Sequence, residues 1–260
     1  MKYSTKQPSQ NHNVSHDKPL REFFALLLGA ALLFGAFLLI AGFLVDRAAL
    51  YIDPALEARL FSNRFFDSRE APTEREAVLQ TVLDGLAACI DVGYPVRLRI
   101  VESDDLNAFA YPGGSIVVLS ALADTLNTKN GMAFVLAHEL AHFRNRDHLR
   151  GMGRSLVFLA ASVAVTGANS GLSSLLTPAL GLEGAQFSQH RESDADATAL
   201  HALNCFAGDV RDATEFFQLV QAVHGDIDWS TTHYFSSHPQ VSDRIAAIER
   251  LAREFGYVLY

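Results

Sequence analysis

The segment His138-Glu139-Leu140-Ala141-His142 decides how this sequence of 260 residues is interpreted. On an α-helix, residues four apart lie about 40° from each other around the axis, so His138 and His142 can bind one metal ion. Glu139 lies about 60° from His142, where its carboxylate can reach a water molecule rather than the metal. Two histidines leave an open position on a tetrahedral zinc ion, which a catalytic zinc requires. The pattern predicts a zinc site with Glu139 as general base.

The residues around this motif favour a buried helix. Asn130-Gly131 interrupts the preceding chain, and residues 132–137 then run apolar into the motif. Apolar residues recur at steps of three and four, which is typical of a helix inside a protein. The alternative is a helix that carries two ordinary histidines, and other parts of the sequence have to decide between them.

Two residues compete for the role of third metal ligand. The first is His148, six residues after His142, in a pattern close to the metzincin motif but with Asn145 in place of a glycine. Metzincins also need a methionine turn well downstream. Met152 follows His148 by only four residues, which is too close to fold back under the site.

The second candidate is Glu192, which shares a helix face with Asp196. Glu192 would bind the metal, and Asp196 would accept the free N–H of a ligating histidine. A solvated acidic turn is the alternative, but small and apolar residues crowd positions 195–203, as in a buried helix. Glu192 is therefore the preferred third ligand.

These motifs, together with three others, resemble a known family. The segment 107–114 is similar to the strand and turn that precede the metal helix in the peptidases that include the heat-shock protease HtpX and the CAAX prenyl endopeptidases. Residues 115–119 resemble the strand that follows, and Ser237-His238-Pro239 resembles the C-terminal His-Pro segment of that family. The resemblance covers about residues 75 to 250.

The resemblance implies a gluzincin fold and one Zn²⁺ per chain, held by His138, His142 and Glu192. It also implies that Glu139 is the catalytic base and that His238 approaches the metal site, where it stabilises the oxyanion or caps the zinc at rest. The expected substrates are proteins or peptides. Their extended backbone is expected to pair with the strand that contains Asn107, Ala108 and Phe109.

The other strong feature is an apolar segment near the N-terminus. Residues 23–45 contain no charge, and a helix of this length spans about 34 Å, enough for a bilayer core of about 30 Å. A signal peptide is the alternative, but its apolar region is shorter, and here Asp46-Arg47 follows without a clear cleavage site. We therefore expect a disordered polar tail over 1–22, a transmembrane anchor over 23–45, a linker over 46–72 and a zinc metallopeptidase domain over 73–260.

The orientation of this anchor follows from its flanking charges. Four basic residues (Lys2, Lys6, Lys18 and Arg21) precede the segment, and three (Arg47, Arg59 and Arg64) follow it within about 20 residues. This difference favours a catalytic domain on the exterior or periplasmic side. A second charge-free stretch over 155–182 is interrupted at 167–171 and at Pro178, so we expect a helical hairpin packed on the active-site domain rather than a second span.

The rest of the chain indicates an α+β domain, mostly helical, with a small sheet beside the metal helix. Thr73-x-x-Glu76 is a capping-box signature, residues 96–100 alternate as in a half-exposed strand, and residues 212–224 and 242–255 have helical patterns. The net charge of −8 and the lack of a basic run argue against nucleic acid as a partner. Cys89 and Cys205 have apolar neighbours and are expected to be buried thiols, although an exterior location would permit a disulfide.

The sequence thus predicts a membrane-anchored zinc metalloendopeptidase, with membrane or envelope protein quality control as its expected setting. The rival is a non-catalytic, membrane-tethered scaffold that keeps its metal for stability alone. A structural site has no use for Glu139 beside two ligands and more often has four protein ligands. His238 would be available as a fourth ligand, which keeps this alternative open.

Overall fold

The computed structural model describes residues 19–61, 71–93, 95–166, 189–224 and 242–259. The expected tail up to residue 18, the second half of the expected hairpin and the segment that contains His238 lie outside these residues. Twelve elements are described: α1 (Pro19–Ala49), α2 (Pro54–Phe61), α3 (Glu74–Cys89), β1 (Arg97–Val101), β2 (Ala108–Tyr111), β3 (Ser115–Leu119), α4 (Ser120–Thr125), α5 (Lys129–Arg144), α6 (Asp147–Thr166), α8 (Gln189–Ala207), α9 (Glu215–His224) and α11 (Ser242–Glu254). The expected α+β class, mostly helical with a small sheet, is confirmed.

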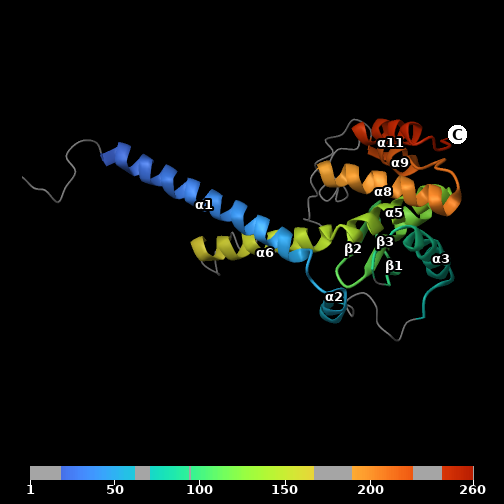
Figure 1. Ribbon diagram of the computed structural model, residues 1–260, viewed down its shortest axis with the longest axis horizontal. Helices are drawn as coiled ribbons and strands as arrows, with labels where there is room; N and C mark the ends of the chain where they lie inside the picture. Colours follow the sequence, from blue (N-terminus) through green and yellow to red (C-terminus); the bar gives the residue numbers. More distant parts are fainter. Residues whose placement is uncertain (1–18, 62–70, 94, 167–188, 225–241, 260) are drawn as a thin grey trace, which may run out of the picture.

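The helix α5, which carries the two histidines, lies at the centre of the domain (Figure 1). Every residue from Gly131 to Phe143 is buried, as the apolar periodicity predicted. The helix begins where the Thr128 hydroxyl accepts a hydrogen bond from the backbone N–H of Gly131, at 3.0 Å. It ends before Arg146, whose positive φ of 59° is the left-handed conformation common just past a helix C-terminus. The sheet, α3 and α8 pack around α5 and exclude water from it.

The sheet has the order β1-β3-β2, with β1 and β3 parallel and β2 and β3 antiparallel. The connection from β2 to β3 is a tight turn in which Gly113 and Gly114 have φ values of 93° and 78°, a conformation that side chains with a Cβ rarely adopt. In this strand order β2 pairs with β3 on one side only, so β2 is an edge strand. It lies against α5.

The capping box at the start of α3 also joins this helix to the sheet. The Glu76 carboxylate accepts the backbone N–H of Thr73 at 2.8 Å, and the Thr73 hydroxyl accepts that of Glu76 at 3.2 Å. The same carboxylate accepts the backbone N–H of Ile100 in β1 at 2.9 Å. One residue thus stabilises the helix terminus and sets the position of α3 on the sheet.

Cys89 and Cys205 form a disulfide, so the interpretation as two buried thiols is wrong. Their Cα atoms lie 6.1 Å apart, although 116 residues separate them in the sequence. The pairing arises because α3 and α8 pack side by side and bring their C-terminal ends together. Cys205 is exposed and Cys89 half-buried, so apolar neighbours in the sequence did not indicate burial here.

The apolar N-terminal segment forms α1, a helix of 31 residues that is long and apolar enough to cross a membrane. It begins at Pro19, before the expected start of the span, and it continues past Val45 to Ala49. The helix α6 packs along its C-terminal half, where the Val45 side chain approaches Gly153. The first half of the expected 155–182 hairpin is therefore part of one 20-residue helix beside α1, not an arm packed on the active-site domain (Figure 1).

The segment expected to be a linker contains the short helix α2, and its residue Glu57 is completely buried. The Glu57 carboxylate accepts the backbone N–H of Gly113 at 2.8 Å, lies 2.9 Å from His148 Nε2 and pairs with the Arg146 guanidinium. Burial raises the pKa of Glu57. The hydrogen bond and charge of His148, together with Gly113 and Arg146, lower the pKa by more than burial raises it, so the net shift is downward. Through these contacts Glu57 holds the segment after α1 against the chain that follows α5 and against the β2–β3 turn.

Glu57→Ala should lower the midpoint of heat-induced unfolding in detergent by roughly 6 °C or more, because removing one partner of a buried ion pair costs about 3–5 kcal/mol. The exposed Glu74→Ala in the first turn of α3 is the matched control and should change little. Since the folded-state pKa of Glu57 is depressed, its contribution to stability is present above the ordinary pKa of a glutamate and is lost as the pH falls through the lowered value. An equal change in both variants would contradict this role.

Candidate metal centre

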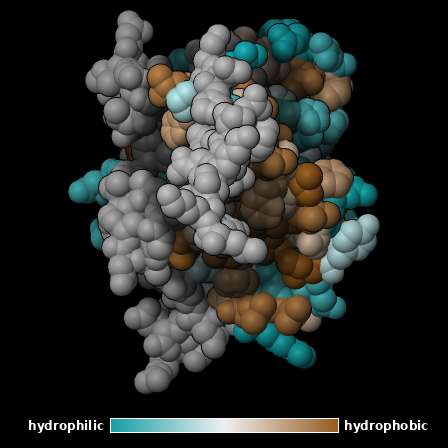
Figure 2. Space-filling view, turned by 90° about the vertical axis from the view of Figure 1, so that its left-hand side faces the viewer, coloured by the Kyte–Doolittle hydropathy of each residue, from teal (hydrophilic) through white to brown (hydrophobic). Residues whose placement is uncertain are grey.

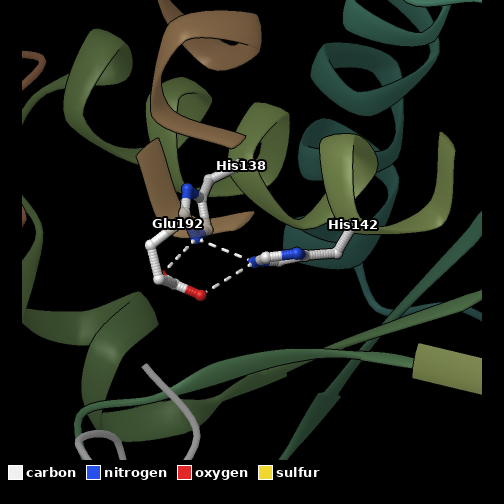
Figure 3. Close-up of side chains that lie close together, drawn as sticks. All are labelled: His138, His142 and Glu192. Carbon is white, nitrogen blue, oxygen red and sulfur yellow. Dashed lines mark hydrogen bonds and ion pairs between the residues drawn. The ribbon is translucent and has the colours of Figure 1, made fainter. Parts of the chain in front are cut away.

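His138, His142 and Glu192 converge at the contact between α5 and α8 (Figure 3). The His138 Nε2 atom lies 3.1 Å from His142 Nε2 and 3.4 Å from the Glu192 carboxylate. The His142 Nε2 atom lies 3.5 Å from the other oxygen of that carboxylate. All three side chains are buried, with at most 3% of their surface exposed. Two histidines of α5 and a glutamate of α8, at least 50 residues later in the sequence, thus present three ligand atoms to one point.

These three atoms fit a zinc ion. Two ligands bound at about 2.0–2.1 Å to a tetrahedral zinc lie about 3.4 Å from each other, close to each of the three separations here. Two imidazole nitrogens with one carboxylate are also a ligand set found in catalytic zinc sites, where water or substrate takes the remaining position. Both the donor chemistry and the spacing therefore suit this metal.

The second ring nitrogen of His138 faces an acidic residue. Its Nδ1 atom lies 3.0 Å from Asp196, which follows Glu192 by one turn of α8. Burial lowers the pKa of His138, but hydrogen bonds with Asp196 and Glu192 outweigh it and raise the pKa to about 9. The surrounding carboxylates therefore strongly favour a positive charge at this point.

The second ring nitrogen of His142 has an equivalent partner that the sequence analysis missed. Its Nδ1 atom lies 3.1 Å from Asp147, which is completely buried at the start of α6. Each histidine therefore has its Nε2 turned toward the common point and its Nδ1 held by an aspartate, the arrangement that fixes the tautomer of a metal-binding imidazole. An acid directly after the metal helix was a visible signal, but the sequence did not show that the chain turns back there.

Arg244 on α11 is a second residue without a predicted role. Its guanidinium binds Asp196 through two hydrogen bonds of 2.9 and 2.6 Å, and its Nη1 lies 2.9 Å from Glu192. It also lies over the ring of Phe217, 4.6 Å from the centroid. The Arg244 charge lowers the pKa of Asp196, against the opposing effect of burial. Arg244 thus favours the ionised form of Asp196 and holds the side chains of Asp196 and Glu192 in place.

Glu139 is buried beside the two histidines and contacts the sheet. Its Oε2 atom accepts a hydrogen bond of 2.9 Å from the backbone N–H of Ala110 in β2. This N–H lies on the free edge of β2, so it points away from β3 and toward α5. The edge of β2 and the Glu139 carboxylate therefore adjoin one another, as a general base next to a substrate-binding strand requires.

The structure also places the rival ligand His148 and the expected substrate-binding strand. His148, the rival metal ligand, lies 2.9 Å from Glu57 and is outside the group of three. Asn107 and Ala108 are buried and Phe109 is half-buried. The backbone carbonyl of Asn107 already accepts the N–H of Leu119 at 2.9 Å.

This chain is similar to known metalloproteases. The sequence pattern of peptidase family M48 matches residues 73–252, from the capping box of α3 to α11. The chain is 30% identical over 167 residues to the metalloprotease YcaL of Escherichia coli, a match that covers 62% of this chain and 64% of that protein. It is 34% identical over 131 residues to the metalloprotease LoiP of the same organism, covering 48% and 51% of the two chains.

A third relative is the beta-barrel assembly-enhancing protease of Yersinia pestis, with 32% identity over 136 residues, which covers 48% of this chain and 28% of that protein. The matched segments thus amount to less than two thirds of each relative's own length. The family match, in contrast, includes every element that supplies the three ligand residues and the residues that hold them. This chain belongs to peptidase family M48.

Proposed function

We propose that this chain is a membrane-anchored, zinc-dependent metalloendopeptidase that hydrolyses peptide bonds in proteins. The observation that carries the proposal is the convergence of two imidazoles and one carboxylate at zinc-like separations, with the buried Glu139 carboxylate alongside. A purely structural site would have no role for Glu139, which distinguishes this proposal from the scaffold alternative.

His138, His142 and Glu192 are the proposed ligands of one Zn²⁺ per chain. When bound, the zinc ion would lower the pKa of a water molecule and polarise the scissile carbonyl of the substrate. Asp196 and Asp147 would hold the two imidazoles in the tautomer that presents Nε2 to the metal. Arg244 would balance the negative charge of this acidic cluster.

Glu139 is the proposed general base. Its carboxylate would take a proton from the attacking water and pass it to the amine that leaves when the peptide bond breaks. The hydrogen bond from Ala110 occupies Oε2 and fixes the plane of the carboxylate. This orientation is what the transfer needs, because a base acts only within hydrogen-bond reach of its proton.

The edge of β2 is the proposed binding strand for an extended substrate. The N–H of Ala110 points away from β3, and Ala108, two residues earlier, has the same orientation by the alternation of a strand. Ala108 is therefore the residue placed to pair with a substrate backbone. Asn107 adds a buried side-chain Oδ1 that has no hydrogen-bond partner among the described residues and would accept an N–H of the substrate. Phe109 would contribute its half-buried side chain.

The catalytic domain is proposed to lie on the exterior or periplasmic side of the membrane. α1 supplies one span, and the excess of basic residues before it favours this orientation. The Cys89–Cys205 disulfide supports it independently, because disulfides persist in oxidising compartments. Substrates would be proteins at or near the membrane, in envelope quality control, a role in line with the name of the beta-barrel assembly-enhancing protease of Yersinia pestis.

His238 is the proposed additional catalytic residue, with stabilisation of the oxyanion as its main role and capping of the metal as the alternative. This proposal rests on the resemblance of Ser237-His238-Pro239 to the family's C-terminal segment. Arg244, six residues later, reaches the metal centre, so the start of α11 lies beside the site.

The proposal is tested by removing the metal from the full-length protein in detergent. Casein cleavage should stop when a zinc chelator such as 1,10-phenanthroline is added and should return when zinc is restored, because the proposed water activation depends on the ion. Magnesium added in place of zinc is the control and should not restore cleavage. Cleavage that persists in metal-depleted protein would overturn the proposal.

Asp147→Asn and Asp196→Asn should each weaken zinc binding by about 10- to 100-fold, the usual cost of losing the partner that orients a ligating histidine. Asp194→Asn, exposed on the same helix as Asp196, is the matched control and should bind zinc normally. Zinc affinity is measured by competition with a chelating dye. If Asp147→Asn binds zinc as tightly as the control, its contact with His142 has no part in metal binding.

A further inference from the structure

A cavity of about 520 Å³ lies where α1 emerges from the apolar segment. Its walls come from the end of α1, the end of α5, the start of α6 and the start of α8. None of the three proposed zinc ligands lines it, although Asp147, which contacts His142, does, so the cavity adjoins the metal centre without including the ligands. Phe43, Asp46 and Arg47 of α1, with Leu50 just after it, form one wall, which places the cavity at the level where a membrane surface would meet the protein.

Four arginines line this cavity: Arg47, Arg144, Arg150 and Arg191. Three aspartates line it as well, but all have partners. Asp147 lies 3.3 Å from Arg150, and Asp46 pairs with Arg154 and lies 3.4 Å from Arg191. Asp194 lies 3.5 Å from His190.

The cavity retains positive charge beyond these pairs. Within the described parts of the chain, no acidic side chain lies within 4 Å of Arg47 or Arg144. Arg150 also has a buried Nε–H without an acceptor among the described residues. Since the planar guanidinium matches the oxygens of a phosphate, this cavity suits a phosphate-bearing anion.

An apolar groove of about 350 Å³ lies between α1 and α6, next to the cavity. The two hollows share Phe43 and Asp46 in their walls, so they adjoin one another. The groove contains Leu38, Leu39 and Gly42 of α1 and Val157 and Phe158 of α6, with Arg154 at its polar end. From Asp46 to Leu38, α1 rises about 12 Å toward the middle of the apolar segment.

The groove lies between two helices that both carry exposed apolar side chains. Figure 2 views the molecule from the side toward which α1 projects, and hydrophobic side chains are visible on the coloured part of the surface. Leu156 and Phe158 on α6 are about half exposed, at 51% and 48%, and most large apolar side chains of α1 are more exposed than these. Both helices therefore present apolar surface at hydrocarbon depth, with the arginines at the level of the headgroups.

We propose that the cavity and the groove together bind one anionic phospholipid, with its phosphate on Arg47 and Arg144 and an acyl chain along the groove beside Gly42. The order of the two hollows along α1, cationic at the surface and apolar at depth, is the order of a phospholipid. Free inorganic phosphate would match the cavity alone, so the groove favours the lipid as occupant.

The test reconstitutes the full-length protein in vesicles of equal parts phosphatidylcholine and phosphatidylglycerol. The protein is extracted in mild detergent and purified again, and the lipid it retains is quantified by mass spectrometry. We expect phosphatidylglycerol to be enriched over phosphatidylcholine by at least about fivefold, the contribution of about one favourable arginine contact at a membrane surface. Excess inorganic phosphate should not displace it.

Two pairs of variants separate the parts of the proposal. Arg47→Gln/Arg144→Gln should abolish the enrichment, whereas Arg250→Gln/Arg253→Gln on α11 removes the same charge elsewhere and should retain it. Gly42→Leu should fill the groove and reduce the retained lipid of both kinds. A Cβ at Gly42 or at Gly35 meets no atom within 4 Å, so the matched Gly35→Leu on the same helix should fold and bind as the wild type does.

Several results would overturn the proposal. Equal loss of enrichment in both arginine pairs would mean that net charge alone attracts the lipid. Normal lipid retention in Gly42→Leu would mean that no acyl chain occupies the groove. Displacement of phosphatidylglycerol by inorganic phosphate would assign the cavity to the free anion instead.

Discussion

Glu139→Gln should leave the zinc content of the protein unchanged and should lower casein cleavage by at least about 100-fold, the lower end of a general base's contribution. Glutamine has the same size, and its side-chain oxygen can still accept the hydrogen bond from the backbone of Ala110. The edge of β2 therefore keeps its position, and only the ability to take a proton is lost. Zinc is measured by atomic absorption on the purified protein and cleavage by release of labelled peptides.

The exposed Glu74→Gln serves as the control for this variant, because it makes the same chemical change on α3. It should cleave casein at the wild-type rate. If Glu139→Gln binds zinc and keeps near-normal activity, Glu139 is not the base, and a different residue of the site must transfer the proton.

Glu192→Ala should lose zinc more severely than either aspartate variant, and its cleavage activity should disappear with the metal. The change removes one of three ligands and leaves Arg244 beside the two histidines with one acidic partner fewer. The expected loss of zinc affinity exceeds the roughly 10- to 100-fold effect of removing a residue that only orients a ligand.

His148→Ala is the informative comparison, because His148 was the rival ligand in the sequence. In the structure its Nε2 faces Glu57 at 2.9 Å, so the variant should lose stability but keep its zinc when measured well below its unfolding temperature. Loss of zinc in His148→Ala with retention in Glu192→Ala would reverse the assignment and restore the metzincin-like alternative.

The arrangement of the residues on α5 could be predicted from local sequence. His138, Glu139 and His142 could be placed on one face because helical geometry sets their angles, whatever the rest of the protein does. The preference for Glu192 over His148 came from the absence of a suitable methionine and from the small residues around 195–203. The sequence could favour Glu192 on these grounds, but its meeting with the two histidines, at least 50 residues earlier, depends on the packing of α8 against α5.

The residues that hold the site were harder to find. Arg244 contacts Asp196 across 48 residues, and Glu57 contacts His148 across 91. Glu57 lies in the segment 46–72, which we expected to be a linker, yet it is completely buried. Asp147 is close to His142 in sequence, but it reaches the imidazole only because the chain turns sharply at Arg146 between α5 and α6.

The sequence by itself determined the apolar segment of α1, the capping box of α3, the α+β class and the helical pairing of His138 with His142, since each depends on intervals of a few residues. Tertiary structure alone decided the Cys89–Cys205 disulfide, the contacts of Arg244 and Glu57, and the apolar groove between α1 and α6. These features depend on which helices pack together. Helix packing arises from the burial of whole apolar faces, and no short interval of sequence records the partner of such a face.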